Sequence, residues 1–294
     1  MQRPSDPAVA VRPLVAGSAI VGSRSEQQDR YRFNWIEEDK AWLLVLADGM
    51  GGHEGGAVAS KIVVDAFTAT FYSRRKQQSG LQECLEASLN AANLLLADAQ
   101  GDNVHLSGMG TTLLAVHLSE AGLIWISVGD SPLWLLRGGQ MLRLNDDHSL
   151  RAIAGASSKN ANMLQSALNG QPIPLIDTQF EPVRLQPKDV LILSSDGLLT
   201  LTEKTIASVA AKHFPSSQAI ADALVSAVTK KGRNNQDNCT VVVATKSRSG
   251  LALAGMKWPW RRASLKIALV VVGLLVVAGV LAAGIYLWRV GQIS

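Results

Sequence analysis

Four apolar runs in this sequence lie directly beside an aspartate, and this pattern constrains the fold more than any other feature. Asp48 follows the run 41–46, Asp130 follows 125–128, Asp196 follows 190–193, and Asp237 precedes 239–243. Short continuous apolar runs are typical of buried β-strands. Carboxylates at the ends of several strands can meet at one edge of a sheet, where their like charges need cations between them. The pattern predicts a site for Mg²⁺ or Mn²⁺, which prefer oxygen ligands, although Asp48 with Gly49 taken alone also fits a solvated turn.

Seven short motifs, taken in order, resemble the signature motifs of a known family. They are 24–29 (RSEQQD), 48–53 (DGMGGH), 110–112 (GTT), 128–131 (VGDS), 147–150 (DHSL), 195–198 (SDGL) and 237–238 (DN). Together they resemble the metal-dependent serine/threonine protein phosphatases, the PPM or protein phosphatase 2C-like family, in its bacterial form. The resemblance implies an α+β fold, a four-layer α-β-β-α sandwich of two mainly antiparallel sheets flanked by helices.

The same resemblance implies a set of metal ligands. Asp48 would bridge two divalent cations, Mn²⁺ or Mg²⁺, with Asp196 and Asp237 on one cation and the Gly49 carbonyl on the other. Asp130 would bind a third, weaker metal. The cations would lower the pKa of a bridging water and supply the hydroxide that attacks phosphorus.

The resemblance also implies two catalytic residues besides Asp48. Arg24 would grip the substrate phosphate with both arms of its guanidinium group, although without the neighbouring motifs it reads as an ordinary surface arginine. Asp29 would orient the attacking water. The implied function is hydrolysis of phosphoserine and phosphothreonine on proteins, opposing a membrane-proximal Ser/Thr kinase.

The sequence departs from the family pattern at four positions. Gln27 and Gln28 stand where Asn and then Glu or Gln are usual, and Pro132 and Ser166 each replace an arginine. These departures motivate an alternative, a membrane-anchored pseudo-phosphatase that acts as a phosphoprotein-binding regulatory module. A small-molecule phosphatase with the same metals is a second alternative. The four groups needed for catalysis are all present, although they are far apart in the chain, and this favours the protein phosphatase. They are Arg24, Asp48, Asp196 and Asp237.

Other chemistries lack residues that they need. Cys84 is not followed by the arginine of a cysteine-dependent phosphatase, and Ala57 stands where a zinc protease beginning at His53 would need its second histidine. Two cysteines imply no disulfide framework. Seven of the 28 basic residues and none of the 24 acidic ones lie after Thr245, which leaves 21 basic against 24 acidic residues before it. This balance predicts no nucleic-acid partner.

Composition and periodicity divide the chain into an N-terminal arm (1–13), a phosphatase domain (14–246), a basic linker (247–266), a transmembrane helix (267–288) and a short tail (289–294). Within the domain, strands are predicted at 14–22, 31–37, 41–47, 108–118, 123–129, 132–136, 141–144 and after 237. Helices are predicted at 54–75, 81–99, 202–213 and 216–231. Residues 145–182 read as an irregular flap.

The segment 267–288 contains 22 consecutive uncharged residues. At about 1.5 Å per residue, a helix of this length crosses a bilayer core of about 30 Å. Lys257, Arg261, Arg262 and Lys266 precede it and Arg289 follows it, so the positive-inside rule places the domain in the cytoplasm. We therefore expect a single-pass protein of the cell inner membrane with a cytoplasmic catalytic domain.

Overall fold

The computed structural model describes residues 13–51, 55–150 and 163–246, which contain two β-sheets. One sheet has the order β1 (Leu14–Ile20), β11 (Cys239–Thr245), β10 (Val190–Ser194), β7 (Leu133–Arg137) and β8 (Gln140–Arg143). The other has the order β2 (Asp29–Ile36), β3 (Ala41–Met50), β5 (Leu113–Leu118), β6 (Leu123–Val128) and β9 (Asp177–Val183), with β4 (Gly110–Thr111) beside β3. Every pair of neighbouring strands is antiparallel.

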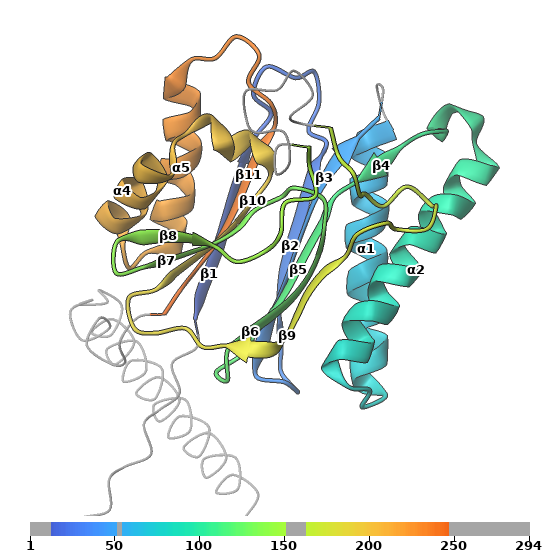
Figure 1. Ribbon diagram of the computed structural model, residues 1–294, viewed down its shortest axis with the longest axis horizontal. Helices are drawn as coiled ribbons and strands as arrows, with labels where there is room; N and C mark the ends of the chain where they lie inside the picture. The colour runs from blue at the N-terminus through green and yellow to red at the C-terminus, as the bar shows by residue number, and fades with distance from the viewer. Residues whose placement is uncertain (1–12, 52–54, 151–162, 247–294) are drawn as a thin grey trace, which may run out of the picture. The chain divides into compact units, whose positions relative to one another are not determined.

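Helices cover the outer face of each sheet (Figure 1). Helices α1 (Gly55–Lys76) and α2 (Leu81–Asp102) pack on the β2-to-β9 sheet, and α4 (Glu203–His213) and α5 (Ser217–Lys231) pack on the β1-to-β8 sheet. Two short 3₁₀ turns, η1 (Val104–Leu106) and η2 (Asp196–Thr200), complete the described elements. The predicted four-layer α-β-β-α sandwich is confirmed.

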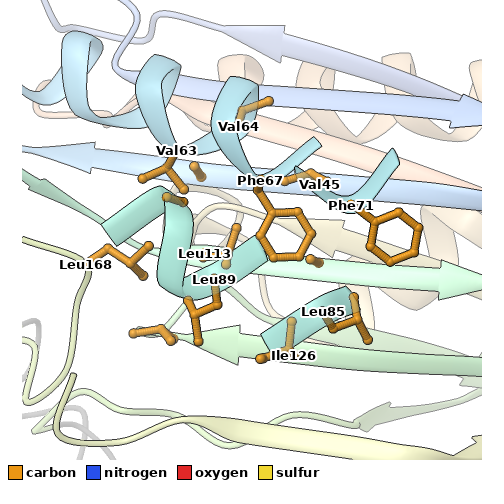
Figure 2. Close-up of a cluster of buried hydrophobic side chains, with 14 of the residues drawn as sticks. Val45, Val63, Val64, Phe67, Phe71, Leu85, Leu89, Leu113, Ile126 and Leu168 are labelled. Atoms are coloured by element: carbon orange, nitrogen blue, oxygen red, sulfur yellow. The ribbon is translucent and has the colours of Figure 1, made fainter. Parts of the chain in front are cut away.

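Three apolar clusters hold the layers together, and strand β3 shows why its sequence is continuously apolar. Leu43 and Val45 face the helices, whereas Leu44 and Leu46 face the other sheet, because successive side chains of a strand point to opposite faces. Figure 2 shows the helix-side cluster, in which Phe67 of α1 lies among side chains from α2 and the sheet.

Most predicted elements agree with the structure to within a few residues, with two corrections near the site. The segment read as an irregular flap contains β9, which pairs with β6 as an edge strand. The sequence does not predict this strand, because it is polar and contains Pro182. An edge strand tolerates both proline and exposed side chains. Asp48 does not end its strand, because β3 continues to Met50 and pairs there with β4.

In residues 13–51, 55–150 and 163–246, no helix is long and apolar enough to cross a membrane. The predicted linker 247–266, transmembrane helix 267–288 and tail 289–294 lie outside the described residues, as does the arm before Pro13.

Candidate active site

The predicted acidic residues lie at one end of the sandwich. Asp29 begins β2 and is the register partner of Asp48 on β3. Asp130 follows β6 by two residues, Asp196 follows β10 by two residues, and Asp237 precedes β11 by two residues. Because β10 and β11 are antiparallel, the end of one strand meets the start of the other. The antiparallel topology therefore gathers residues that are more than 200 positions apart.

A pocket of about 670 Å³ opens at this end. Its lining includes six of the seven predicted site residues: Arg24, Asp48, Gly49, Asp130, Asp196 and Asp237. Asp29 is not part of the lining and lies buried behind it, 3 % exposed. The described flap residues that line the pocket are uncharged and include Met163, Ser166 and Pro172.

Two threonines that the sequence analysis did not single out hold Asp48 in place. The Asp48 N–H donates to Thr112 Oγ1 over 2.9 Å, and the Asp48 carbonyl accepts from the Thr112 N–H (2.9 Å) and from Thr111 Oγ1 (2.8 Å). Thr112 Oγ1 also lies 2.8 Å from Ser131 Oγ, in the loop that carries Asp130. In the sequence, the GTT motif indicates these two residues. Their hydrogen bonds connect the segment that carries Asp48 with the segment that carries Asp130.

Gly49 and Gly197, each next to an acidic residue, permit close backbone approach. A Cβ on Gly49 would lie 2.0 Å from the Gly56 carbonyl oxygen at the start of α1. A Cβ on Gly197 would lie 1.9 Å from the Asn238 carbonyl oxygen. Neither glycine has a positive φ, so lack of a side chain, rather than a turn, requires glycine at both positions.

Asp29 has one satisfied and one unsatisfied carboxylate oxygen. Ser195 Oγ donates to its Oδ2 over 2.7 Å, and the Asp29 N–H donates to Gln27 Oε1 over 3.0 Å. Its buried Oδ1 meets no hydrogen-bond partner among the described residues. Burial raises the pKa of Asp29 to about 6, and the hydrogen bond from Ser195 opposes that rise.

Asp48 is a strongly perturbed acid of the site. Burial raises its pKa well above the usual value, and the charges of four other carboxylates raise it further: Asp29, Asp196, Asp130 and Asp237. Among the described residues that line the pocket, Arg24 is the one cation, and its Nη2 lies 2.6 Å from Asp237 Oδ2. That hydrogen bond raises the pKa of Arg24. Five acids beside one arginine form a site with an excess of negative charge.

Asn238 connects the Arg24 loop to the start of β11. Its side-chain amide donates to the carbonyls of Val21 (2.7 Å) and Glu26 (3.0 Å), and its Oδ1 accepts from the Gln28 N–H (2.7 Å). This residue, also missed as a site residue, follows Asp237 directly in the DN motif and positions the loop from β1 to β2 over the pocket.

The oxygen donors that line the pocket, carboxylates and the Gly49 carbonyl, suit hard divalent cations. No three His, Cys, Asp or Glu side chains in the part of the chain described here already have the spacing of a metal-ligand set. Asp237, one of the predicted ligands, is paired with Arg24 instead. The individual ligand roles therefore stay predictions.

The residues that depart from the family pattern have structural roles. Gln27 accepts from Asp29 as described, and the Gln28 carbonyl accepts from the Gly49 N–H over 3.2 Å. The Pro132 carbonyl accepts from the Ser194 N–H over 3.2 Å. Ser166 is buried and closes its own loop, donating to the Leu175 carbonyl (2.6 Å) and accepting from its N–H (3.0 Å).

Comparison with known proteins gives a consistent result. The family model described as protein phosphatase 2C matches residues 16–236. The serine/threonine phosphatase stp of Listeria innocua serovar 6a is 30% identical over 226 residues, which cover 71% of this chain and 86% of that protein.

Two solved structures are also similar. The Mycobacterium tuberculosis serine/threonine phosphatase PstP/Ppp has a TM-score of 0.68 and 27% identity, covering 80% of this chain and 99% of that one. The catalytic domain of PstP in complex with two manganese ions has a TM-score of 0.65 and 28% identity, covering 79% and 97%. With a family model that spans more than half of its length, the chain belongs to the protein phosphatase 2C family.

Proposed function

We propose that this protein is a metal-dependent phosphatase that hydrolyses phosphoserine and phosphothreonine on other proteins. The observation that carries the proposal is the pocket in which Arg24 and four aspartates from separate strands face one another. The like charge of these aspartates, expressed in the raised pKa of Asp48, suits a site that binds cations. The names of the similar bacterial proteins, which are serine/threonine phosphatases, support the same activity.

Asp48, Asp196 and Asp237 would hold two divalent cations, with the Gly49 carbonyl as a further ligand. When bound, these cations supply Lewis acidity and an activated water near neutral pH. Mn²⁺ is supported by the PstP catalytic domain, which is described with two manganese ions, and Mg²⁺ is the other candidate. Asp130, buried at 4 % exposure with its backbone held by Arg143, would hold a third and weaker cation.

Arg24 would bind the phosphoryl group. Its side chain is 56 % exposed and lines the pocket, so a phosphate can reach the guanidinium group without rearrangement of the fold. A guanidinium matches two phosphate oxygens at once and offsets charge as it develops on them.

Asp29 would orient the attacking water. Its Oδ2 accepts a hydrogen bond from Ser195 Oγ. Its Oδ1 accepts none from the described residues and can accept one from water. Cations bound beside it would offset the neighbouring charges that raise its pKa, so Asp29 would act as an ionised hydrogen-bond acceptor. No protein nucleophile is needed, since water attacks phosphorus directly.

The cellular setting of the proposal comes from the sequence. Residues 267–288 would anchor the protein in the cell inner membrane with the domain in the cytoplasm, where it would oppose a Ser/Thr kinase near the membrane. The pseudo-phosphatase alternative rests on the departures at Gln27, Gln28, Pro132 and Ser166. The pocket lined by Arg24 and the aspartates supports the enzyme instead.

A phosphate-release assay on a phosphothreonine peptide tests the proposal. The full chain should release phosphate with Mn²⁺ and should be inactive in EDTA. The variants Asp48→Ala and Asp196→Ala should be inactive with Mn²⁺ present. Asp222→Asn, on the exposed face of α5, is the matched control and should keep full activity. A folded wild type that releases no phosphate with either metal would favour the binding module instead.

A further inference from the structure

The last turn of α5 and the connection that follows it carry a group of positive charges near the active site. We call Lys230, Lys231 and Arg233 the cationic loop; all three are exposed, and none forms an ion pair in the part of the chain that the structure describes. Lys230 and Lys231 suit the negative end of the helix dipole. Arg233 follows the left-handed Gly232 that caps α5, so helix stability does not explain it.

The cationic loop is joined directly to the wall of the active-site pocket. The Ser23 N–H donates to the Gln236 carbonyl over 2.7 Å, and the Gln236 N–H donates to Ser23 Oγ over 3.2 Å. The next residue on each segment, Arg24 and Asp237, lines the active-site pocket. Figure 1 shows these two connections, from β1 to β2 and from α5 to β11, side by side at one end of the sandwich.

The same two segments also line a second hollow of about 380 Å³, through Ser23 and Gln236. Ile20 and the buried Val228 supply apolar surface, and Ser23, Arg233 and Gln236 supply polar groups. No acidic residue is among the described residues that line it, in contrast to the four aspartates of the active-site pocket. Adjacent residues of the same two segments line both cavities. The active-site pocket is lined mainly by acidic charges, whereas Arg233 is the charged residue of the second hollow among its described lining residues.

We propose that this hollow is an accessory subsite for an anionic residue of the phosphoprotein substrate, either a carboxylate or a second phosphate. Arg233 would bind the anionic group, since a guanidinium matches both carboxylate and phosphate oxygens. The apolar surface would contact the carbon stem of the same residue. The proposal rests on the proposed protein phosphatase function, and it names the class of substrate that the same site prefers.

Close contacts tie together the two segments that line both cavities. Gly22 has φ +68°, and a Cβ there would lie 2.4 Å from the Asp237 carbonyl oxygen. The Asn238 side chain holds the same loop through the Val21 and Glu26 carbonyls. Because these contacts tie the two segments together, we expect the preference to depend on how far the second anion lies from the phosphothreonine along the peptide.

Kinetics of the Mn²⁺-loaded full chain on matched peptides test the subsite. One peptide has a single phosphothreonine and neutral neighbours, a second series places one glutamate two to five residues away on either side, and a third places a non-hydrolysable phosphonate at the same positions. The wild type should prefer one anionic spacing by about tenfold in kcat/KM, mainly through KM, which is the size expected of one charge-assisted hydrogen bond.

Substitutions separate the subsite from general electrostatics. Arg233→Ala should abolish the preference and leave turnover of the neutral peptide unchanged, whereas Arg233→Lys should restore part of it. Lys212→Ala, an exposed cation on α4, is the matched control and should keep the preference. Preference in the glutamate series indicates a carboxylate partner, and preference in the phosphonate series alone indicates a second phosphate.

Two failures are distinguishable. If the neutral peptide is hydrolysed and no anionic peptide is preferred at any spacing, or if Arg233→Ala keeps the preference, the subsite is refuted and the phosphatase function stands. If the metal-loaded chain hydrolyses none of the peptides, the proposed function fails and the subsite fails with it.

Discussion

The hairpin of β2 and β3 has a half-buried aspartate at each end, and the surroundings of the two carboxylates shift their pKa values in opposite directions. At the closed end, Asp39 in the turn is bound by the Arg75 guanidinium and lies 3.2 Å from His117 Nε2. Burial acts to raise the pKa of Asp39, but Arg75 and His117 outweigh it and the pKa is lowered. At the open end, burial and neighbouring carboxylates raise the pKa of Asp48.

From this difference we infer that Asp39 serves the fold and Asp48 serves the site. The fold supplies a cation for Asp39 within the same domain, as expected of a structural buried charge. Around Asp48 it places further acids, so we expect cations from solution to neutralise their charge. A cluster of like charges lowers the stability of the fold when no cation is bound. Neutralising Asp48 should therefore lower activity and raise metal-free stability, whereas neutralising Asp39 should lower stability and leave activity nearly unchanged.

The largest expected effect is on activity at the open end. Asp48→Asn keeps the shape of the side chain but removes the charge that would hold both cations, so kcat/KM should fall at least about a hundredfold. Asp39→Asn should leave kcat/KM within about threefold, since Asp39 lies at the other end of the hairpin. Steady-state hydrolysis of a phosphothreonine peptide measures both. Equal losses in the two variants would mean that the ends are not functionally distinct.

The next effect is stabilisation by metal at the open end. Mn²⁺ at about one hundred times its dissociation constant should raise the free energy of unfolding of the wild type by about 2.7 kcal/mol for each cation bound. Asp48→Asn should show little of this gain, and Asp39→Asn should show all of it. Urea unfolding with Mn²⁺ and with EDTA gives the comparison. A full gain in Asp48→Asn would place the cations elsewhere.

Much of this architecture could be predicted from sequence because its signals are local. The helix 81–99 begins at the observed Leu81 of α2, and the run 190–193 is β10, since apolar periodicity records burial directly. The acidic site residues were found because each sits in a short motif. Their meeting follows from the antiparallel order of the strands, which the motifs do not contain.

The features that could not be predicted depend on partners far away in the chain. Strand β9 exists because it pairs with β6 and because Asp177 accepts from Trp125 Nε1 over 2.8 Å, 52 residues away. His117 looked like one of several scattered histidines, and its partner Asp39 is 78 residues distant. Thr112 and Ser195 support the acids from neighbouring strands, and only the fold reveals what they contact.

A smaller effect contrasts the two ends in metal-free protein. Asp39→Asn should lower the free energy of unfolding by about 2 kcal/mol, because it leaves Arg75 without its counter-ion. Asp48→Asn in EDTA should raise it by about 1 kcal/mol, because it removes one charge from a repelling group. Denaturant unfolding at pH 7.5 in EDTA measures both changes. Destabilisation by Asp48→Asn would show that its carboxylate is already compensated within the protein.

The smallest effect is a pH dependence at the closed end. Burial lowers the pKa of His117, while Asp39 opposes the shift and Arg75 adds to it. The folded state therefore holds the ring neutral at a pH where the unfolded chain, with a histidine pKa of about 6.5, begins to bind a proton. By linkage, stability should fall as pH decreases through about 6.5.

His117→Gln isolates this contribution, because glutamine can still donate to Asp39 but does not titrate. The difference in free energy of unfolding between wild type and His117→Gln should shift against the wild type as pH falls from about 7.5 to about 5.5. Taking the difference cancels the opposite trend of the active-site acids, whose raised pKa values stabilise the metal-free fold as pH falls. A difference that does not change with pH would mean that His117 is equally basic in the folded and unfolded chain, and the closed end would then owe its stability to Arg75 alone.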